Sequence, residues 1–258
     1  MLQTQKIIAQ GAEARIIKQG ISIIKKRISK GYRIKELDKK IRKQRTKSET
    51  KLLEKASKLV NIPQPVKADK YNITMPLING LKLSDNLDKL PLNKQLKICK
   101  QIGKDTAKLH DADIIHGDLT TSNMILVDDE IDNKEDGVNK DNKKANSIIP
   151  NKRLADTKIS NNADNLGLTF NNKVNNHGLS KQKFKIYFID FGLGYTSKKI
   201  EDKAVDIHLL RQALEAKHFR NWEKLFGSFI KGYKISNQSH KVLEQLKKVE
   251  ARGRYKEK

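Results

Sequence analysis

Three polar side chains in the middle of the chain have the types and spacing that could bind a hard cation. Asp118 and Asn123 precede an apolar run, Met124–Val127, and Asp190 follows a second run that includes Lys185–Ile189. If the two runs pair as an antiparallel hairpin, the start of the first strand and the end of the second share one end of the ladder. Asn123 and Asp190 would then be neighbours whatever lies between the strands. Carboxylate and amide oxygens suit Mg²⁺, so the sequence predicts a metal site beside Asp118.

Two motifs of phosphoryl transfer surround these side chains. Residues 116–123 read His-Gly-Asp-Leu-Thr-Thr-Ser-Asn, the H-x-D-x-x-x-x-N pattern, and residues 190–192 read Asp-Phe-Gly. Enzymes of the protein-kinase type use this ordered pair to place a base and magnesium beside ATP. We therefore expect Asp118 to accept the proton of an attacking hydroxyl or water, and Asn123 and Asp190 to hold the metal that bridges the phosphates.

The elements that must position these groups can be read from the apolar patterns. Strands are expected at Lys6–Gln10, Ala14–Lys18, Ile21–Arg27 and Asn72–Ile78. Helices are expected at 34–60, Leu92–Leu109, Ala204–Lys217 and around Val242–Val249. A further helix is expected along a stripe of aromatic residues that should belong to the core, namely Phe219, Trp222, Phe226, Phe229 and Tyr233. The first half is β-rich with one long helix, and the second half is mainly helical. We therefore predict an α+β fold with an N-lobe, residues 1–79, and a C-lobe, residues 80–258.

Phosphoryl transfer also requires a lysine on the last strand of the N-terminal sheet, oriented by a carboxylate. Lys25 is our choice, with Glu49 as its ion-pair partner. Lys26 is the competitor, since a slip of one residue reverses the face of a strand. Glu49 lies on the predicted inward face of the long helix, where an unpaired carboxylate would be costly. An exposed acid in a frayed helix is the alternative interpretation of Glu49.

The turn between the first two strands is expected to cover the phosphates. It reads Gln10-Gly11-Ala12-Glu13-Ala14, and with one glycine it is a poor match to G-x-G-x-x-G. Its place between two strands is what favours a nucleotide loop. The predicted nucleotide contacts are Ile8, Gln10, Gly11, Ala12, Glu13, Ala14, Ile16, Lys25, Met75 and Ile78. His116 is expected to pack beneath the Asp-Phe-Gly turn rather than to act as an acid or base.

Composition narrows the class of partner and the compartment. The net charge of +24 over 258 residues favours an anionic partner or substrate, either nucleotide, RNA or acidic protein, although a solvated lysine-rich surface is the alternative. Aromatic residues are only 5%, which argues against a stacking platform for single-stranded nucleic acid. Cys99 is the sole cysteine, so an intrachain disulfide and thiolate metal clusters are excluded, and a buried thiol is expected. No apolar stretch is long enough for a membrane span, and the N-terminus lacks a signal-peptide pattern, so we expect no membrane and a cytoplasmic location.

Residues 131–183 differ in composition from the rest of the chain. They are rich in Asn, Lys and Asp and have no sustained periodicity, which predicts disorder. They fall in the turn of the proposed hairpin, at the end away from Asn123 and Asp190. Because the cost of loop closure grows slowly with length, we expect a surface insertion without a catalytic role.

Several motifs together resemble one known family. They are Gln10–Ala14, Lys25–Arg27, Lys30–Arg33, Glu36–Asp38, Arg45, Thr46, Glu49, Ile115–Asn123, Ile189–Leu193, Asp202–Asp206 and Arg252–Arg254. On these residues the chain resembles the small atypical serine/threonine kinase subunit of the KEOPS complex, a family related to the RIO kinases. The resemblance implies a bilobal kinase-like fold that binds ATP and Mg²⁺. It also implies kinase or ATPase activity that supports threonylcarbamoyladenosine modification of tRNA beside the anticodon, with the KEOPS transferase subunit and the other KEOPS subunits as partners. The tail residues Arg252 and Arg254 would be associated with tRNA, where they could contact the phosphate backbone without reading bases.

The sequence departs from ordinary protein kinases at two points. Gly117 stands where an arginine would clamp a phosphorylated activation loop, and only thirteen residues separate Gly192 from Asp206. The C-lobe should therefore be reduced and lack an activation segment, which favours restricted phosphorylation, autophosphorylation or partner-dependent ATP hydrolysis.

Two other functions stay open at this point. A small-molecule phosphotransferase of the aminoglycoside or choline kinase type also carries His-Gly-Asp, although Phe191-Gly192 and the short C-terminal half argue against it. A non-catalytic ATP-binding module in an RNA-modifying assembly is the other. The phosphate acceptor and the partner of the basic stretch Lys25–Lys47 also stay open.

Overall fold

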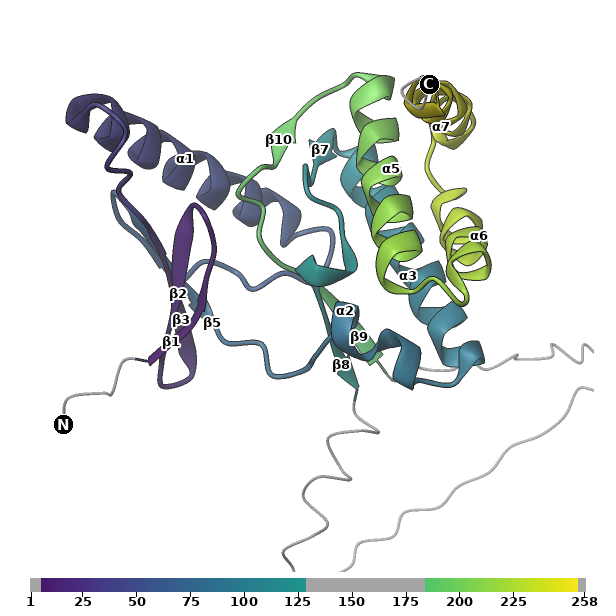
Figure 1. Cartoon of the computed structure of the whole chain (residues 1–258), viewed down its shortest axis with the longest axis horizontal. Helices are drawn as coiled ribbons and strands as arrows, with labels where there is room; N and C mark the ends of the chain where they lie inside the picture. The colour runs from purple at the N-terminus through teal and green to yellow at the C-terminus, as the bar shows by residue number, and fades with distance from the viewer. Residues whose placement is uncertain (1–5, 129–183, 255–258) are drawn as a thin grey trace, which may run out of the picture. The chain divides into compact units, whose positions relative to one another are not determined.

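The N-terminal part of the chain forms a five-stranded antiparallel sheet beside one long helix (Figure 1). The computed structural model describes residues 6–128 and 184–254, and side chains as far as Arg252. The strands are β1 (Lys6–Gln10), β2 (Ala14–Gln19), β3 (Ser22–Arg27), β4 (Lys67–Ala68) and β5 (Asn72–Pro76), in the order β1-β2-β3-β5-β4, and the helix is α1 (Lys35–Ala56). The predicted strands are confirmed, apart from differences of one or two residues at their ends and the short β4, which the sequence did not indicate.

The register of the sheet decides between the two candidate lysines. Lys25 of β3 pairs with Ile16 of β2 and Ile73 of β5, and it is buried. Lys26 is exposed, because neighbouring residues of a strand point to opposite faces. Lys25 therefore lies on the covered face of the sheet, as predicted.

Helix α1 contacts its surroundings through charged side chains as well as through apolar ones. Its buried residues are Asp38, Thr46, Glu49, Leu52, Leu53 and Ala56. The predicted apolar face is confirmed, but the helix ends at Ala56 instead of residue 60. The backbone N–H groups of Leu59 and Val60 both donate to the Ala56 carbonyl, which closes the last turn.

The C-terminal part combines short strands with four long helices among the described residues. The elements are β6 (Leu81–Lys82), α2 (Leu83–Asn86), the 3₁₀ turn η1 (Leu87–Lys89), α3 (Leu92–Asp111), β7 (Ile114–Ile115), the 3₁₀ turn η2 (Thr121–Asn123), β8 (Met124–Asp128), β9 (Phe184–Phe188), β10 (Tyr195–Thr196), α5 (Ile200–Lys217), α6 (Trp222–Tyr233) and α7 (Ser239–Arg254). Strands β6, β8 and β9 form one antiparallel sheet, and β7 pairs with β10. The hairpin of β8 and β9 is confirmed, with Met124 opposite Phe188 and Asp128 opposite Phe184. The predicted insertion at 131–183 lies outside the described residues.

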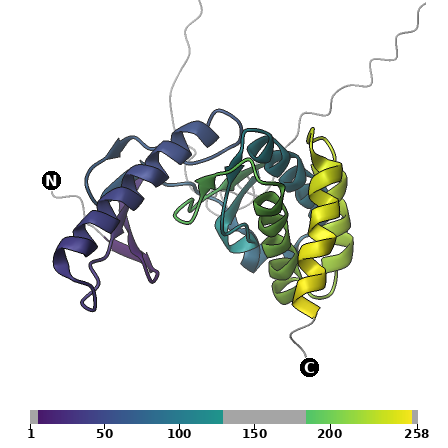
Figure 2. The same cartoon turned by 90° about the horizontal axis from the view of Figure 1, so that it is seen from above.

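Helices α3 and α6 approach each other closely because each has a glycine where it meets the other. A Cβ atom on Gly103 of α3 would lie 2.1 Å from the Phe229 carbonyl oxygen, and one on Gly232 of α6 would lie 2.0 Å from the Lys100 carbonyl oxygen. The contact helps to fix the core, in which Phe229 and Tyr233 are fully buried. Helix α7, yellow in Figure 2, packs on α5.

Most of the aromatic stripe belongs to the core, as predicted. Trp222 and Phe226 are partly buried against it, but Phe219 is 69% exposed. The prediction was wrong for Phe219, because α6 begins only at Trp222 and the helical spacing does not extend back to it.

Two further expectations can be compared with the structure. Cys99 is buried in α3, and burial raises the pKa of its thiol to about 12. No helix within the described ranges combines the length and the hydropathy needed to cross a bilayer. The proposed division into lobes at residues 79 and 80 stays a prediction.

Candidate active site

The hairpin brings the two predicted metal ligands to one end of its ladder. Asn123 immediately precedes β8 and Asp190 follows β9 by two residues, and the backbone N–H of Ile189 donates to the Asn123 carbonyl at 3.0 Å. Asp190 has a φ of +62°, a left-handed conformation that is uncommon for a residue other than glycine. The chain thus turns sharply at the residue that carries the carboxylate.

Asn123 also orients the predicted base. Its Nδ2 donates to Asp118 Oδ2 at 2.8 Å and to the Asp118 carbonyl at 2.9 Å. Because Nδ2 makes both contacts, the amide oxygen of Asn123 is left as an oxygen donor for a ligand. Asn123 thus contacts Asp118 directly, and its carbonyl accepts the N–H of Ile189, the residue before Asp190.

Lys25 connects the N-terminal sheet to this group. Its Nζ lies 2.6 Å from Glu49 Oε1 and 2.6 Å from Asp190 Oδ1, and Arg27 donates to Glu49 Oε2 at 2.5 Å. The predicted pair of Lys25 and Glu49 is thus present. Lys25, Arg27 and Glu49 are buried, and two cations with two carboxylates make the set neutral overall. Such compensation is what allows charged groups to be buried.

The pKa of Asp190 reflects this environment. Burial of its carboxyl would raise the pKa, but the charge and hydrogen bond of Lys25, together with the N–H of Gly192, hold it below the usual range. Lys25 and Gly192 both contact Oδ1, so Oδ2 of this half-exposed side chain is left to face a ligand. A Cβ atom on Gly192 would lie 2.9 Å from Asp190 Oδ1 and 3.3 Å from Lys25 Nζ, so any larger residue would press on the ends of these two side chains.

These oxygen donors suit Mg²⁺ bound together with phosphates. In the part of the chain that the structure describes, no three His, Cys, Asp or Glu side chains are grouped so as to hold a metal ion. Mg²⁺, however, is usually held by one or two protein oxygens and completes its shell with phosphate and water. The Asn123 amide and the Asp190 carboxylate fit that pattern.

His116 packs against the Asp-Phe-Gly segment, as predicted. Its ring centroid lies 4.5 Å from that of Phe191, and its Nε2 lies 3.1 Å from the Ile189 carbonyl oxygen. The N–H of Asp118 lies 3.3 Å from Nδ1, which must therefore be the acceptor, so Nε2 carries the proton. Complete burial lowers the pKa of His116, against the opposing charges of Asp206, Asp190 and Asp118.

Sequence reasoning missed the role of Asp206 on α5. Its two carboxylate oxygens accept the backbone N–H groups of His116 at 2.8 Å and Gly117 at 3.0 Å, so this buried side chain holds the loop that carries Asp118. His110 Nε2 lies 3.2 Å from the same carboxylate. The available signal was an acid among the inward positions of α5, beside Ala204 and Ile207.

A second buried contact holds the other end of the loop that carries Asp118. The hydroxyl of Thr121 lies 3.2 Å from Nε2 of His218, which follows the last residue of α5, and both side chains are buried. Asp88 Oδ2 lies 3.0 Å from His218 Nδ1, without hydrogen-bond alignment. No sequence pattern pointed to this contact, because its partners come from three separate elements.

The predicted nucleotide contacts occupy the turn and the same face of the sheet as Lys25. Ala14, Ile16 and Met75 lie on that face by their register, whereas Ile8 lies at a bulge of β1 and is 46% exposed. Ile78 lies after β5, in the connection to the C-terminal part. The turn Gln10–Ala14 is closed by a hydrogen bond from the Gly11 N–H to the Ala14 carbonyl at 2.9 Å.

The tail residues lie on a different element. Arg252 of α7 forms an ion pair with Glu201 of α5, and the side chain of Arg254 lies outside the described residues. Neither observation connects the tail to Asp118.

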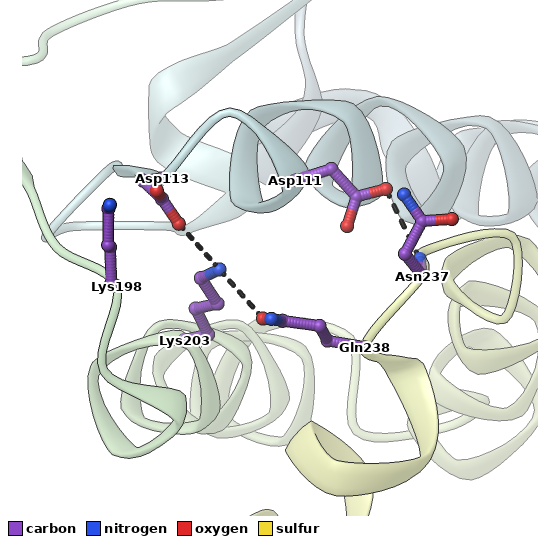
Figure 3. Close-up of a pocket in the computed structure, with 6 residues that line it drawn as sticks. All are labelled: Asp111, Asp113, Lys198, Lys203, Asn237 and Gln238. Carbon is purple, nitrogen blue, oxygen red and sulfur yellow. Dashed lines mark hydrogen bonds and ion pairs between the residues drawn. The ribbon is translucent and has the colours of Figure 1, made fainter.

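A polar pocket of about 280 Å³ lies among the end of α3, the start of α5 and the connection between α6 and α7 (Figure 3). Its lining consists of Asp111, Asp113, Lys198, Lys203, Asn237 and Gln238. The buried Lys203 donates to Asp113 at 2.9 Å and to Gln238 at 3.1 Å, so it joins the end of α3, the start of α5 and the connection between α6 and α7. None of the predicted site residues lines this pocket. The hydrogen bonds of Lys203 across it connect three parts of the C-terminal fold, so we interpret its polar groups as structural.

Comparison with known proteins agrees with this fold and gives the family of the chain. Residues 18–133 match the RIO domain family. The chain is 34% identical to the KEOPS complex subunit Bud32 of Pyrococcus abyssi, over 98% of this chain and 97% of that protein. It is 32% identical to a probable serine/threonine-protein kinase BUD32 homolog of Archaeoglobus fulgidus, over 95% of this chain and 93% of that protein.

Two further likenesses extend the comparison. The chain is 32% identical to a probable bifunctional tRNA threonylcarbamoyladenosine biosynthesis protein of Methanobrevibacter smithii, over 96% of this chain but 36% of that protein. The Rio2 kinase from Chaetomium thermophilum, solved as an ADP/Mg²⁺-phosphoaspartate complex, has a TM-score of 0.53 at 12% identity, over 97% of this chain and 71% of that one. This likeness supports the predicted α+β kinase-like fold. By its sequence identity along nearly the whole length of its relatives, the chain belongs to the Bud32 family of RIO-related proteins.

Proposed function

We propose that this chain is an ATP-dependent atypical serine/threonine kinase and ATPase that works as a subunit of the KEOPS complex in the cytoplasm. The observation that carries this proposal is the ion-paired set of Lys25, Glu49 and Asp190 beside Asn123 and Asp118. A lysine held between two carboxylates, beside a third carboxylate that Asn123 orients, favours an active site over an inactive nucleotide-binding fold.

Each side chain has a role that follows from its contacts. Lys25 has three N–H donors, of which Glu49 and Asp190 take two, so the third can reach a phosphate oxygen of ATP. Asn123 and Asp190 would hold Mg²⁺, which supplies charge neutralisation of the phosphates when bound. Asp118 has one oxygen fixed by Asn123, so its other oxygen can accept the proton of the attacking hydroxyl or water.

The phosphate acceptor is expected to be restricted. Gly117 has a φ of +77°, and a Cβ atom there would lie 2.3 Å from the Leu193 carbonyl oxygen, so no arginine can occupy this position. After Gly192 the chain forms only the short β10 before α5 begins at Ile200. We infer that the phosphate acceptor is the chain itself, a few other proteins or water, because little surface is left to bind a peptide.

The names of the relatives supply the partners. We propose that the chain assembles with the KEOPS transferase subunit and supports threonylcarbamoyladenosine formation on tRNA, as the names of the Pyrococcus and Methanobrevibacter proteins suggest. Contact of the basic tail with the tRNA backbone, through Arg252 and Arg254, is part of the same proposal.

Release of labelled γ-phosphate from Mg-ATP tests the proposal. The native chain is compared with Asp118→Asn, and with Glu223→Gln on the exposed side of α6 as a control, each alone and with the transferase subunit and tRNA. We expect Asp118→Asn to lower turnover by about 10²- to 10⁴-fold, the usual contribution of a general base, and the control to be unchanged. Nucleotide binding without turnover in every mixture would show that the chain is a non-catalytic module.

A further inference from the structure

The turn that would cover the phosphates contains a carboxylate, which is electrostatically unfavourable there. A charge of the same sign a few ångströms from the phosphates of ATP would oppose binding. In the structure Glu13 is directed to two arginines instead. Arg45 Nη1 lies 2.9 Å from its Oε2, and Arg33 Nη2 lies 3.5 Å from its Oε1.

The backbone of the turn is attached to the same region of the protein. Ile28, which follows β3, donates its N–H to the Glu13 carbonyl at 3.1 Å, and Lys30 donates to the Ala12 carbonyl. The turn is thus connected by its side chain to α1 and by its main chain to the segment that leads into α1.

Helix α1 also holds the phosphate-contacting lysine. Arg45 and Glu49 are four residues apart, which places them on one face of the helix. Through Arg45 this face reaches the turn, and through Glu49 it reaches Lys25. One rigid element can therefore set the distance between the cover of the nucleotide and the lysine beneath it.

We propose that Glu13, Arg33 and Arg45 form a latch that positions the turn Gln10–Ala14 over the nucleotide. Glu13 acts as a positioning residue and does not contact phosphate, and the arginines also neutralise its charge. The inference rests on the proposed function, because it requires that the chain binds Mg-ATP. It gives the acidic residue of this glycine-poor loop a role.

The exposure of the latch makes it separable from the stability of the fold. The side chains of Glu13 and Arg45 are 37% and 39% exposed, so the pair is partly solvated and contributes little to global stability. Breaking the latch should leave the protein folded and release only the turn.

A double-mutant cycle on the full chain tests the latch. Glu13→Gln, Arg45→Gln and the double variant are compared for the dissociation constant of a fluorescent ATP analogue with Mg²⁺ and for the KM and kcat of ATP hydrolysis. Each single variant should weaken binding and raise KM by about two- to fivefold, the worth of a partly exposed ion pair, while kcat stays the same, because the turn orders the nucleotide without taking part in proton transfer. The double variant should lose no more than Glu13→Gln alone, since that change already removes the contact of Arg45.

Matched controls carry the same charge changes at exposed positions away from the turn. Glu54→Gln on α1 and Lys224→Gln on α6 should leave nucleotide binding unchanged. Tighter binding by Glu13→Gln would show that the carboxylate acts only by repulsion, and additive losses would show that the two residues act separately; either result overturns the latch alone. Absence of nucleotide binding by the native chain overturns the proposed function and the latch with it.

Discussion

At the scale of single residues, the site depends on one histidine being neutral. His116 accepts from the Asp118 N–H at Nδ1 and contacts the Ile189 carbonyl through Nε2, so its single ring proton is fixed on Nε2. A second proton on Nδ1 would break the contact with the residue that carries the base. The buried ring thus links Asp118 to the Asp-Phe-Gly segment only in its neutral form.

This arrangement predicts a pH dependence of stability. The pKa of His116 is lowered in the folded chain from 6.5, so the unfolded chain binds more protons as the pH falls below that value. The free energy of unfolding should therefore decrease between pH 7 and pH 5. In His116→Phe that slope should be shallower by up to about 1 kcal/mol per pH unit, although the variant is less stable at every pH.

Urea unfolding of both proteins at several pH values measures the slopes. The exposed His240 is the control, and His240→Gln should keep the slope of the native chain. An equal slope in native and His116→Phe proteins would contradict a neutral buried His116.

How far the sequence could predict the site is clear from particular residues. Asn123 and Asp190 could be placed together because an antiparallel ladder fixes which ends meet, whatever its loop contains. The contacts of Asp206 and His218 could not, because both reach the catalytic loop from 89 to 97 residues away, and an acid on the inward side of α5 does not show which loop it contacts. The contact of Glu13 with Arg45 was missed for the same reason, since the sequence does not show which residue of the inward face of α1 lies beside the turn.

At the scale of elements, apolar periodicity predicted the long helices and the main strands better than the short pieces. The two-residue strands β4, β6, β7 and β10 have no periodicity to detect, and tertiary contacts alone define them. The glycine contact between α3 and α6 likewise cannot be predicted from the sequence, because a glycine within a helix does not indicate which other helix packs against it.

Two glycines of α6 should respond to alanine in opposite directions. Gly232→Ala places a Cβ atom 2.0 Å from the Lys100 carbonyl oxygen, so α3 and α6 must separate, and we expect a loss of about 1–3 kcal/mol. Gly227 has no atom within 4 Å of an added Cβ, so Gly227→Ala should gain up to about 1 kcal/mol of helix propensity. Midpoints of urea unfolding at equal m-values measure both changes. Similar effects at the two positions would mean that α3 and α6 are not in close contact.

At the scale of the whole molecule, the net charge of +24 is concentrated in part on α1. Seven of its lysines are exposed: Lys35, Lys39, Lys40, Lys43, Lys47, Lys51 and Lys55. No other described residue forms an ion pair with any of them. An unpaired lysine surface without aromatic rings suits a phosphate backbone, which is bound without base readout.

Salt dependence of tRNA binding tests this surface. Replacing Lys40, Lys43, Lys47 and Lys51 by Gln should reduce the slope of log K against log salt by about 3, since each lost phosphate contact removes about 0.7–0.9. A control that replaces Lys224, Lys231, Lys234 and Lys241, which are exposed on α6, directly after it and on α7, carries the same loss of charge. Equal slopes for the two variants would assign the effect to total charge rather than to α1.

The charged contacts of α1 have a consequence for the response of the protein to temperature. Asp38 with Arg33, Glu13 with Arg45, and Glu49 with Lys25 and Arg27 attach this helix to its surroundings beside its apolar contacts. The penalty for removing charges from water decreases on warming, while the hydrophobic contribution per unit area levels off. The contribution of the contacts that set the position of Lys25 to stability should therefore rise, relative to that of the apolar core, as the protein is heated.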